Sequence, residues 1–461
     1  MQEHLPDVAE VALHPGTWYW VAGGIFLVAL ALIVSEKIHK TKVALAAGAL
    51  MIALPILEQH EAFYSRRFGI DYDVVFLLIG MMVLVNILAR TGVFEYAAVR
   101  LAKLGQGKPI RILILFVLLT AVASAFLDNV TTVLLMTPVT LLIAAELDID
   151  PTPFLVAEVL ASNIGGTATL IGDPPNIIIG SRADLNFIDF LVHLAPIVVV
   201  ILLVFLGACI LVCGKRLHVD DAKRMRLMRM DERTLMKDPR LARRSVAVLS
   251  LVLVGFILHG AVHLEPATIA LLGAATLLLL MPGDPHKVLA EVEWTTIFFF
   301  IGLFIMVGGI VKVGIIGDIS ELVIDVTHPT AEDMSLTASL VLWASGILSA
   351  FVDNIPYVAT MSPLIQDTAN AVFHGGAADS AALPYETLHH PVLMPVWWAL
   401  ALGSCLGGNG TPIGASANVI VLGIAARAGT RISFLRFMAI GIPTMVGTLA
   451  ISHLYLWLRY F

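Results

Sequence analysis

The chain has 461 residues, of which 58% are hydrophobic and only 14% are charged, with a mean hydropathy of +0.90. A soluble core of ordinary size cannot absorb so much apolar surface, so lipid is the expected solvent. The net charge of -7 comes without a basic stripe interleaved with aromatic residues, which excludes a nucleic-acid partner. Cys209, Cys213 and Cys405 are too few for a disulfide framework or a zinc site, and the sequence indicates no cofactor and no metal.

Apolar runs long enough to cross about 30 Å of hydrocarbon recur along the chain, and they do not alternate as barrel strands do. They predict an all-α integral membrane protein. After an acidic extramembrane segment at 1–17, the first half is expected to hold spans at 18–34, 42–57 and 74–91, a paired element at 110–146, a broken span at 153–180 and a span at 187–213. The second half is expected to hold spans at 245–260, 266–282 and 295–313, a paired element at 336–371, a broken span at 394–424 and a span at 434–458.

Three segments of the first half recur, in the same order, in the second half. FLLIGMMVLVNILARTG matches FFFIGLFIMVGGIVKVG, SAFLDNVTTVLLMTPV matches SAFVDNIPYVATMSPL, and SNIGGTATLIGDPPN matches SCLGGNGTPIGASAN. The matches predict a duplication, with one membrane repeat at 18–213, a cytoplasmic linker at 214–244 and a second membrane repeat at 245–461.

Lys and Arg residues concentrate in a few loops, which the positive-inside rule places in the cytoplasm. The segments 35–42, 100–111 and 214–245 are basic, and the last of them carries eleven Lys and Arg residues, whereas 313–393 carries none. Five crossings and one re-entrant hairpin per repeat put every basic segment inside. This predicts about ten transmembrane helices, two hairpins and two repeats of inverted topology in the inner membrane, with both termini outside. Two full crossings in place of a hairpin keep the same parity, so the loop charges leave that choice open.

An Asp-Asn pair stands in the middle of each paired element. Asp128 and Asn129 lie between two apolar stretches, and Asp353 and Asn354 repeat the arrangement. A carboxylate at that depth is costly unless it is hydrated, paired or protonated, so it marks an ion or proton pathway. Asp is also a favoured helix N-cap, and a capped N-terminus still presents N–H groups to a substrate. We therefore expect both pairs to bind ions and both aspartates to couple transport to protons.

The two broken spans carry glycines, prolines and polar side chains within apolar sequence. Gly and Pro do not continue a helix cleanly, so each span is expected to unwind and line a cavity. Close helix packing through small residues is the alternative, but it does not explain an Asp, an Asn and two consecutive prolines. The predicted ligands in these spans are Ser162, Asn163, Gly165, Gly166, Thr167, Asp173, Asn176, Gly408, Asn409, Thr411 and Asn418, with Asp173 as a third proton-coupling group.

Other polar residues within the spans each admit two interpretations. Glu158 lies one turn before Asn163, and it either relays protons or sits near a membrane surface. Cys405 stands where the first repeat has Asn163, as a soft ligand for a thiophilic metalloid or as a small buried hydrophobe. Arg90 and Lys312 are expected to snorkel from helix ends. The sequence has no Walker loop, nucleophile elbow or zincin motif, so we expect no ATP-driven pump within this chain, no enzyme and no catalytic residue.

Taken together, FLDNVTTVLLMTPV, SNIGGTATLIGDPPN, FVDNIPYVATMSPL and GGNGTPIGASAN resemble the ion transporter superfamily, nearest to its ArsB/NhaD-type permeases and its P-protein branch. The likeness covers roughly residues 20–460. It implies a scaffold domain and a mobile transport domain, in which two hairpin tips and two unwound helices hold the substrate. On this chain those positions are Asp128 to Thr131, Ser162 to Thr169, Gly172 to Asn176, Asp353 to Pro356, and Gly407 to Asn418.

The resemblance implies a secondary transporter of a small inorganic solute or ion. Dicarboxylate members resemble Ser-Asn-Thr at both hairpin tips, whereas this chain has Asp in place of each Ser, and two fixed negative charges repel a divalent anion. The favoured hypothesis is proton-coupled efflux of arsenite or antimonite by alternating access, because Cys405 and the GDPPN segment are similar to that branch. A sodium/proton antiporter is the alternative, and a di- or tricarboxylate symporter is less favoured. Besides the lipid bilayer, the partners considered are a second copy in a homodimer and an ATPase subunit.

Overall fold

A computed structural model describes residues 16–35, 37–214, 219–262 and 264–461, so the predicted extramembrane segment lies almost wholly outside the described residues. The described residues form helices joined by loops, without a strand among them. Eight of the helices found there are long and apolar enough to cross a membrane. The prediction of an all-α integral membrane protein is therefore confirmed.

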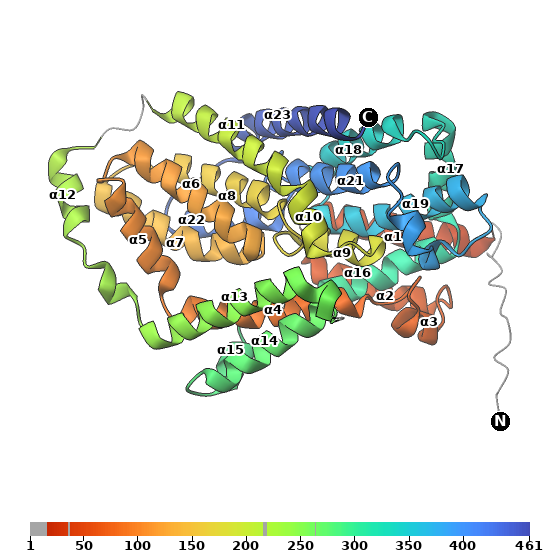
Figure 1. The fold of residues 1–461 in the computed structure, drawn as a ribbon, viewed down its shortest axis with the longest axis horizontal. Coiled ribbons are helices and arrows are strands. Elements are labelled where there is room, and N and C mark those ends of the chain that lie inside the picture. The colour runs from red at the N-terminus through yellow and green to blue at the C-terminus, as the bar shows by residue number, and fades with distance from the viewer. Residues whose placement is uncertain (1–15, 36, 215–218, 263) are drawn as a thin grey trace.

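The helices of the first half begin and end close to the predicted limits, for local reasons. Pro109 opens one helix at its first position, where a missing N–H is tolerated, and Asp128 caps the next helix with its side chain. The helices of this half are α1 (Thr17–Ser35), α2 (Lys40–Ala53), α3 (Gln59–Tyr64), α4 (Tyr72–Arg90), α5 (Val93–Leu104), α6 (Pro109–Phe126), α7 (Asn129–Leu147), α8 (Thr152–Gly166), α9 (Pro174–Ala183), α10 (Phe187–His193) and α11 (Ala195–Cys213) (Figure 1).

The linker and the second half continue the series. Gly314 opens α17 with a φ of 90°, as Gly92 opens α5 with a φ of 77°, because glycine adopts this left-handed conformation at no steric cost. The helices are α12 (Asp221–Arg229), η1 (Glu232–Leu235), α13 (Pro239–Val262), α14 (Pro266–Leu280), α15 (Pro285–Leu289), α16 (Trp294–Lys312), α17 (Ile315–Thr327), α18 (Ser335–Ser349), α19 (Asn354–His374), η2 (Ser380–Ala382), α20 (Tyr385–Leu388), α21 (Met394–Gly407), α22 (Ser416–Arg427) and α23 (Phe434–Tyr460).

Corresponding helices of the two halves make corresponding contacts. α6 packs on α8 in the first half, and α18 packs on α21 in the second. Other contacts exchange partners between the halves, because α2 packs on α16 and α4 on α14, while α7 meets α22 and α19 meets α9. In Figure 1, α2, α4, α13, α14 and α16 lie along the lower side, with the hairpin and broken helices above them. This exchange of partners is what an internal duplication predicts.

Both ends of the α6–α7 pair lie against α12. Arg224 donates to the Gln106 carbonyl, just before α6, at 3.1 and 3.2 Å. Lys223 Nζ lies 2.7 Å from Asp148 Oδ2, just after α7. The pair therefore enters and leaves on the same side of the molecule, as a re-entrant hairpin and two full crossings both do, and α6 and α7 are each long and apolar enough to cross a membrane.

The linker is docked on α5 by ion pairs. Lys103 donates to a Glu232 carboxylate oxygen, and Arg100 Nη1 lies 2.9 Å from the other oxygen. The hydrogen bond from Lys103, with the help of Arg100, lowers the pKa of Glu232 to about 2. The backbone N–H of Lys237 donates to the Thr91 carbonyl at 2.8 Å. The linker is thus fixed to the helix that precedes the first hairpin.

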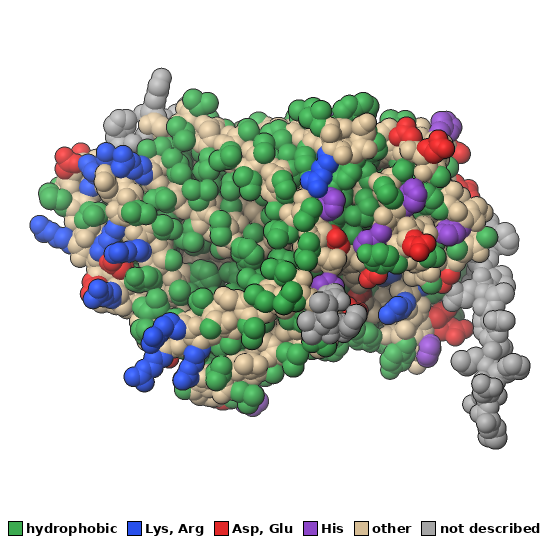
Figure 2. Space-filling model, viewed as in Figure 1, with side chains coloured by type: hydrophobic (Ala, Val, Ile, Leu, Met, Phe, Trp, Pro, Cys, Tyr) green, Lys and Arg blue, Asp and Glu red, His purple; other side chains and the backbone are tan. Residues whose placement is uncertain are grey.

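Charged side chains gather at the two ends of the molecule, as Figure 2 shows. Most of the visible Lys and Arg side chains lie at the end with α5 and α12, and Asp, Glu and His side chains gather at the end with α17. A band of hydrophobic side chains lies between them. The predicted orientation would put α5 and α12 in the cytoplasm.

Candidate functional site

Four helix N-termini meet at one place inside the molecule: those of α7, α9, α19 and α22. The N-cap residues of the first three are Asp128, Asp173 and Asp353, whereas α22 has Ala415 at this position. A helix N-terminus carries partial positive charge and attracts anions, and an Asp cap cancels that charge. The capping residues therefore make this region acidic instead of anion-attracting.

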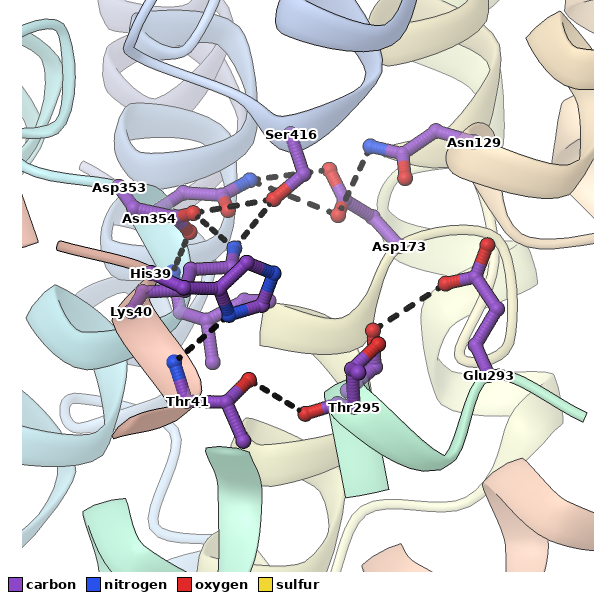
Figure 3. Close-up of polar contacts among 12 residues, drawn as sticks. His39, Lys40, Thr41, Asn129, Asp173, Glu293, Thr295, Asp353, Asn354 and Ser416 are labelled. Carbon is purple, nitrogen blue, oxygen red and sulfur yellow. Dashed lines mark hydrogen bonds and ion pairs between the residues drawn. The ribbon is translucent and has the colours of Figure 1, made fainter. Parts of the chain in front are cut away.

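A cavity of about 480 Å³ lies between these N-termini and the ends of α1, α2 and α16. Its polar and charged lining is drawn in part in Figure 3. Asp128, Asp173, Asp353 and Glu293 supply carboxyl groups, and Lys40 is the one Lys or Arg among the described residues that line it. Within the part of the chain that the structure describes, no cluster of three or more His, Cys, Asp or Glu side chains could hold a metal ion.

Asp173 joins the tips of the two hairpins. Asn129, at the start of α7, donates its amide to Asp173 Oδ1 at 3.1 Å. Asn354, at the start of α19, donates to the same carboxyl group, at 3.3 Å to Oδ2 and 3.4 Å to Oδ1 (Figure 3). All three side chains are at most 3% exposed. One carboxyl group thus holds together two hairpins that come from different halves of the chain.

A chain of asparagine side chains continues behind the cavity. Asn129 donates to Asn163 Oδ1 at 3.2 Å, and Asn163 donates to Asn409 Oδ1 at 2.9 Å and to Asn418 Oδ1 at 3.1 Å. The Asn409 amide nitrogen is buried without a hydrogen-bond partner among the described residues. These amides connect the two unwound segments to each other and to the first hairpin.

The unwound segments are braced in the same way in both halves. Asn176 Nδ2 donates to the Thr169 carbonyl at 2.9 Å, and Asn418 Nδ2 donates to the Thr411 carbonyl at 2.9 Å. The hydroxyls of Thr169 and Thr411 donate in turn to backbone carbonyls at the ends of α6 and α18. Freed backbone groups inside a membrane need such partners, so these side chains stabilise the breaks.

The two hairpin-tip aspartates have different partners. Asp128 accepts from the Thr131 N–H at 2.8 Å and from the Thr131 hydroxyl at 2.5 Å, which occupies both of its oxygens. The second half has Pro356 at the place of Thr131, without N–H or hydroxyl. Asp353 therefore caps its helix through the Ile355 N–H at 3.2 Å with one oxygen and leaves the other oxygen available.

That free oxygen of Asp353 binds two side chains. Lys40 Nζ lies 2.6 Å from Asp353 Oδ2, and Ser416 Oγ donates to the same oxygen at 3.0 Å. Lys40 also donates to Ser416 Oγ at 2.6 Å. The three groups form a closed triangle at one wall of the cavity (Figure 3).

The structure places the predicted site residues in two groups. Those that line the cavity are Asp128, Asn129, Asp173, Asp353 and Asn354. Those that lie behind the cavity lining, where several of them brace the tips and the unwound segments, are Thr131, Ser162, Asn163, Gly165, Gly166, Thr167, Asn176, Cys405, Gly408, Asn409, Thr411 and Asn418.

Neither Cys405 nor Glu158 is among the residues that line the cavity. Cys405 is fully buried, and its thiol donates to Asn176 Oδ1 at 3.5 Å and lies next to the Asp173 carboxyl. Glu158 is 2% exposed and accepts from the Thr140 hydroxyl at 2.7 and 2.9 Å. Glu158 is thus buried against α7, its position relative to the membrane surface stays a prediction, and Cys405 has the environment of a small buried residue.

Sequence reasoning missed several residues near the cavity. Lys40 was expected in a basic loop, but it begins α2 and turns inward, and only its contact with a residue far along the chain reveals this role. Glu293 and His39 line the cavity as well. Arg90 and Lys312 stand at the ends of α4 and α16 and form ion pairs, with Glu291 at 2.8 Å and with Glu61 at 2.5 Å respectively, while their expected snorkelling stays a prediction.

A family model described as CitMHS, Citrate transporter, matches residues 30–403. The chain belongs to this citrate transporter family. Two mycobacterial relatives are similar over almost their whole length: an uncharacterized transporter of Mycobacterium tuberculosis, 46% identical over 96% of this chain and 98% of its own, and a 46 kDa membrane protein of Mycobacterium leprae, 44% identical over 95% and 98%.

The P protein of Homo sapiens is a more distant relative of this family member. It is 32% identical over 513 residues, which cover 95% of this chain but 59% of the P protein. The resemblance to the ion transporter superfamily and its P-protein branch is thereby confirmed. The chain is a multi-pass membrane transporter, and the family name does not by itself assign its cargo.

Proposed function

We propose that the protein is a proton-coupled antiporter of a small cation, with sodium as the favoured cargo. The observation that carries the proposal is the convergence of Asp128, Asp173 and Asp353 on one cavity in which Lys40 is the one Lys or Arg among the described lining residues. Carboxylate and amide oxygens are ligands that hard cations prefer. Each carboxyl can also bind a proton, so cation and proton compete for the same groups.

The charge of the cavity argues against free citrate as the cargo. A tricarboxylate would meet three Asp carboxyls and Glu293, with one ammonium to compensate them. Like charges at close range in a poorly hydrated cavity repel each other strongly. Asp caps on three of the four helix N-termini also remove the partial positive charge that would attract an anion.

Antiport can be tested in everted membrane vesicles from a strain that lacks sodium/proton antiporters. Respiration acidifies the vesicle lumen and quenches a pH-sensitive dye. Addition of sodium should restore the fluorescence if this protein exchanges sodium for luminal protons. A vesicle population that shows no recovery with sodium, lithium or potassium would refute cation antiport.

Asp128→Asn is the matching variant, because it removes one carboxyl charge and keeps the size of the side chain. We expect it to abolish the dye recovery, since Asn neither binds a proton nor neutralises a cation. Asp148→Asn is the control: it makes the same change at the other end of α7, where Asp148 is an exposed partner of Lys223. Surface pairs contribute about 0–1 kcal/mol, so this variant should behave as the parent protein does.

Arsenite efflux is the second candidate. Arsenite is mostly a neutral trihydroxide at neutral pH, and its hydroxyls can donate to the same cavity carboxyls. The thiol that favoured this cargo, Cys405, does not line the cavity. Expression in a strain that lacks arsenite exporters separates the two candidates. If the protein protects this strain from arsenite and sodium gives no recovery of dye fluorescence in vesicles, arsenite and not sodium is the cargo.

A further inference from the structure

Lys40 is held by three groups at the cavity wall. Its ammonium lies 2.6 Å from Asp353 Oδ2, 2.6 Å from Ser416 Oγ and 4.8 Å from the centre of the Phe299 ring. The Lys40 side chain is 26% exposed, and that of Asp353 is 9% exposed. Salt screens such an enclosed pair poorly, and loss of one member leaves the other charge uncompensated.

The pair joins two groups of helices that border the cavity. Lys40 begins α2, which packs on α1 and α16, whereas Asp353 stands at the tip of the α18–α19 hairpin. Ser416, at the start of α22, belongs to the same wall as Asp353. A movement that separates the hairpin tip from the start of α2 would therefore break this ion pair.

We propose that Lys40 is a tethered cation that occupies Asp353 while the cavity holds no cargo, so that a cargo cation or a proton binds Asp353 only when Lys40 leaves it. The two hairpin tips then have unequal roles: among the described residues no Lys or Arg pairs with Asp128, whereas the Asp353 tip is the gated one. This inference deepens the proposed function and rests on it for the identity of the cargo.

The other groups around the cavity favour this exchange. The titratable and charged side chains that face the pair are Asp128, Asp173, Glu293 and His39. Except for His39 they are acids, so the cavity without Lys40 in place attracts a replacement cation. The positive charge of Lys40 compensates Asp353 until that replacement arrives, which avoids an uncompensated carboxylate in a buried site.

Lys40→Met tests the competition in purified protein reconstituted into proteoliposomes. At alkaline pH, where protons are scarce, removal of the competitor should lower the KM for sodium on the order of tenfold. Lys42→Met is the control, because Lys42 lies on the same helix, is exposed and does not line the cavity. An unchanged KM in Lys40→Met, or an equal change in Lys42→Met, would overturn the proposal.

A chemical rescue distinguishes the charge of Lys40 from its packing. In Lys40→Cys, reaction with aminoethyl methanethiosulfonate restores an ammonium on a side chain of similar length, and the KM for sodium should return to the parent value. Methyl methanethiosulfonate adds no charge and should leave the KM low. Equal effects of the two reagents would show that bulk, and not charge, is what matters at this position.

A double-mutant cycle keeps the test independent of the cargo. The melting temperatures of the parent, Lys40→Met, Asp353→Asn and the double variant are measured in detergent without sodium. The melting temperature of the double variant should fall by less than the sum of the decreases in the two single variants, because each single change leaves a buried charge unpaired. Additive decreases in melting temperature would refute the ion pair itself. Non-additive decreases in a protein that transports no sodium would refute sodium as the cargo and would still support the pairing of Lys40 with Asp353.

Discussion

At the scale of single residues, Asp173 is the one of the three cavity aspartates that accepts from a tip asparagine of each hairpin. Asp173→Asn places an amide where the donors of Asn129 and Asn354 point. Because buried hydrogen bonds to a charged group are lost, we expect the variant to lose about 1–3 kcal/mol of unfolding free energy and all sodium-dependent dye recovery. Melting temperature in detergent and the vesicle assay measure the two effects.

Glu291→Gln is the comparison for Asp173→Asn. It removes a carboxyl charge that pairs with Arg90 where the Glu291 side chain is 51% exposed. Exposed pairs contribute little, so both measurements should stay close to those of the parent protein. Parent-like exchange in Asp173→Asn would contradict its assigned place in the site.

Residue chemistry explains which parts of the site the sequence predicted. Asp128 and Asp353 were predicted as site residues because a carboxylate within an apolar run is costly unless it has a function. Asp173 was predicted because it precedes two consecutive prolines within a predicted span. Lys40 did not stand out, because a lysine near the end of an apolar run is normally a solvated loop residue. Its partner lies 313 residues further along the chain, and no local pattern reports such a contact.

At the scale of helices, the hairpins pack on the broken helices through glycines that leave no room for a side chain. A Cβ added at Gly165 would lie 2.1 Å from the Ala121 carbonyl oxygen of α6, and one added at Gly407 would lie 2.5 Å from the Gly346 carbonyl oxygen of α18. We expect Gly165→Ala to push α6 and α8 apart and to lower the unfolding free energy by about 1–3 kcal/mol, measured as a lower melting temperature.

Gly207→Ala provides the matched control for that change. Gly207 lies within α11, and a Cβ there would meet nothing within 4 Å. Alanine has the higher helix propensity, so stability should stay constant or rise slightly. If Gly165→Ala melted at the same temperature as Gly207→Ala, the close approach of α6 and α8 would not be a constraint.

The limits of the helices were more predictable than their pairing. Gly and Pro mark the breaks between α8 and α9 and between α21 and α22, so the sequence indicated both breaks correctly. That α2 packs on α16 and α4 on α14 could not be read from either half alone, because each apolar face fits several partners equally well.

At the scale of the whole molecule, the cavity is reached from the side remote from α17. α1 begins beside α17, where Tyr19 donates to Asp318 at 2.5 Å, and its far end leads to His39 at the cavity rim. α16 likewise ends next to α17 and begins at the rim residue Glu293. Under the predicted orientation, this conformation is open to the cytoplasm.

Accessibility to a membrane-impermeant maleimide tests that orientation. His39→Cys should be labelled in everted vesicles and protected in right-side-out vesicles, because His39 is exposed at the rim. Glu332→Cys, on the exposed loop between α17 and α18, should show the reverse pattern. Labelling of both positions from one side would refute the orientation.

The hydrogen bonds that Asp173 accepts from Asn129 and Asn354 cannot both form until late in the synthesis of the chain. Asn354 is made 181 residues after Asp173, which at about 5–20 residues per second is a delay of roughly 9 to 36 s. Until Asn354 is made, the Asp173 carboxyl of the ribosome-bound chain has only one of its two amide donors, Asn129. The nascent intermediate must keep this group protonated or hydrated, and a chain truncated before Asn354 would expose that defect to the proteases that clear unfinished membrane proteins.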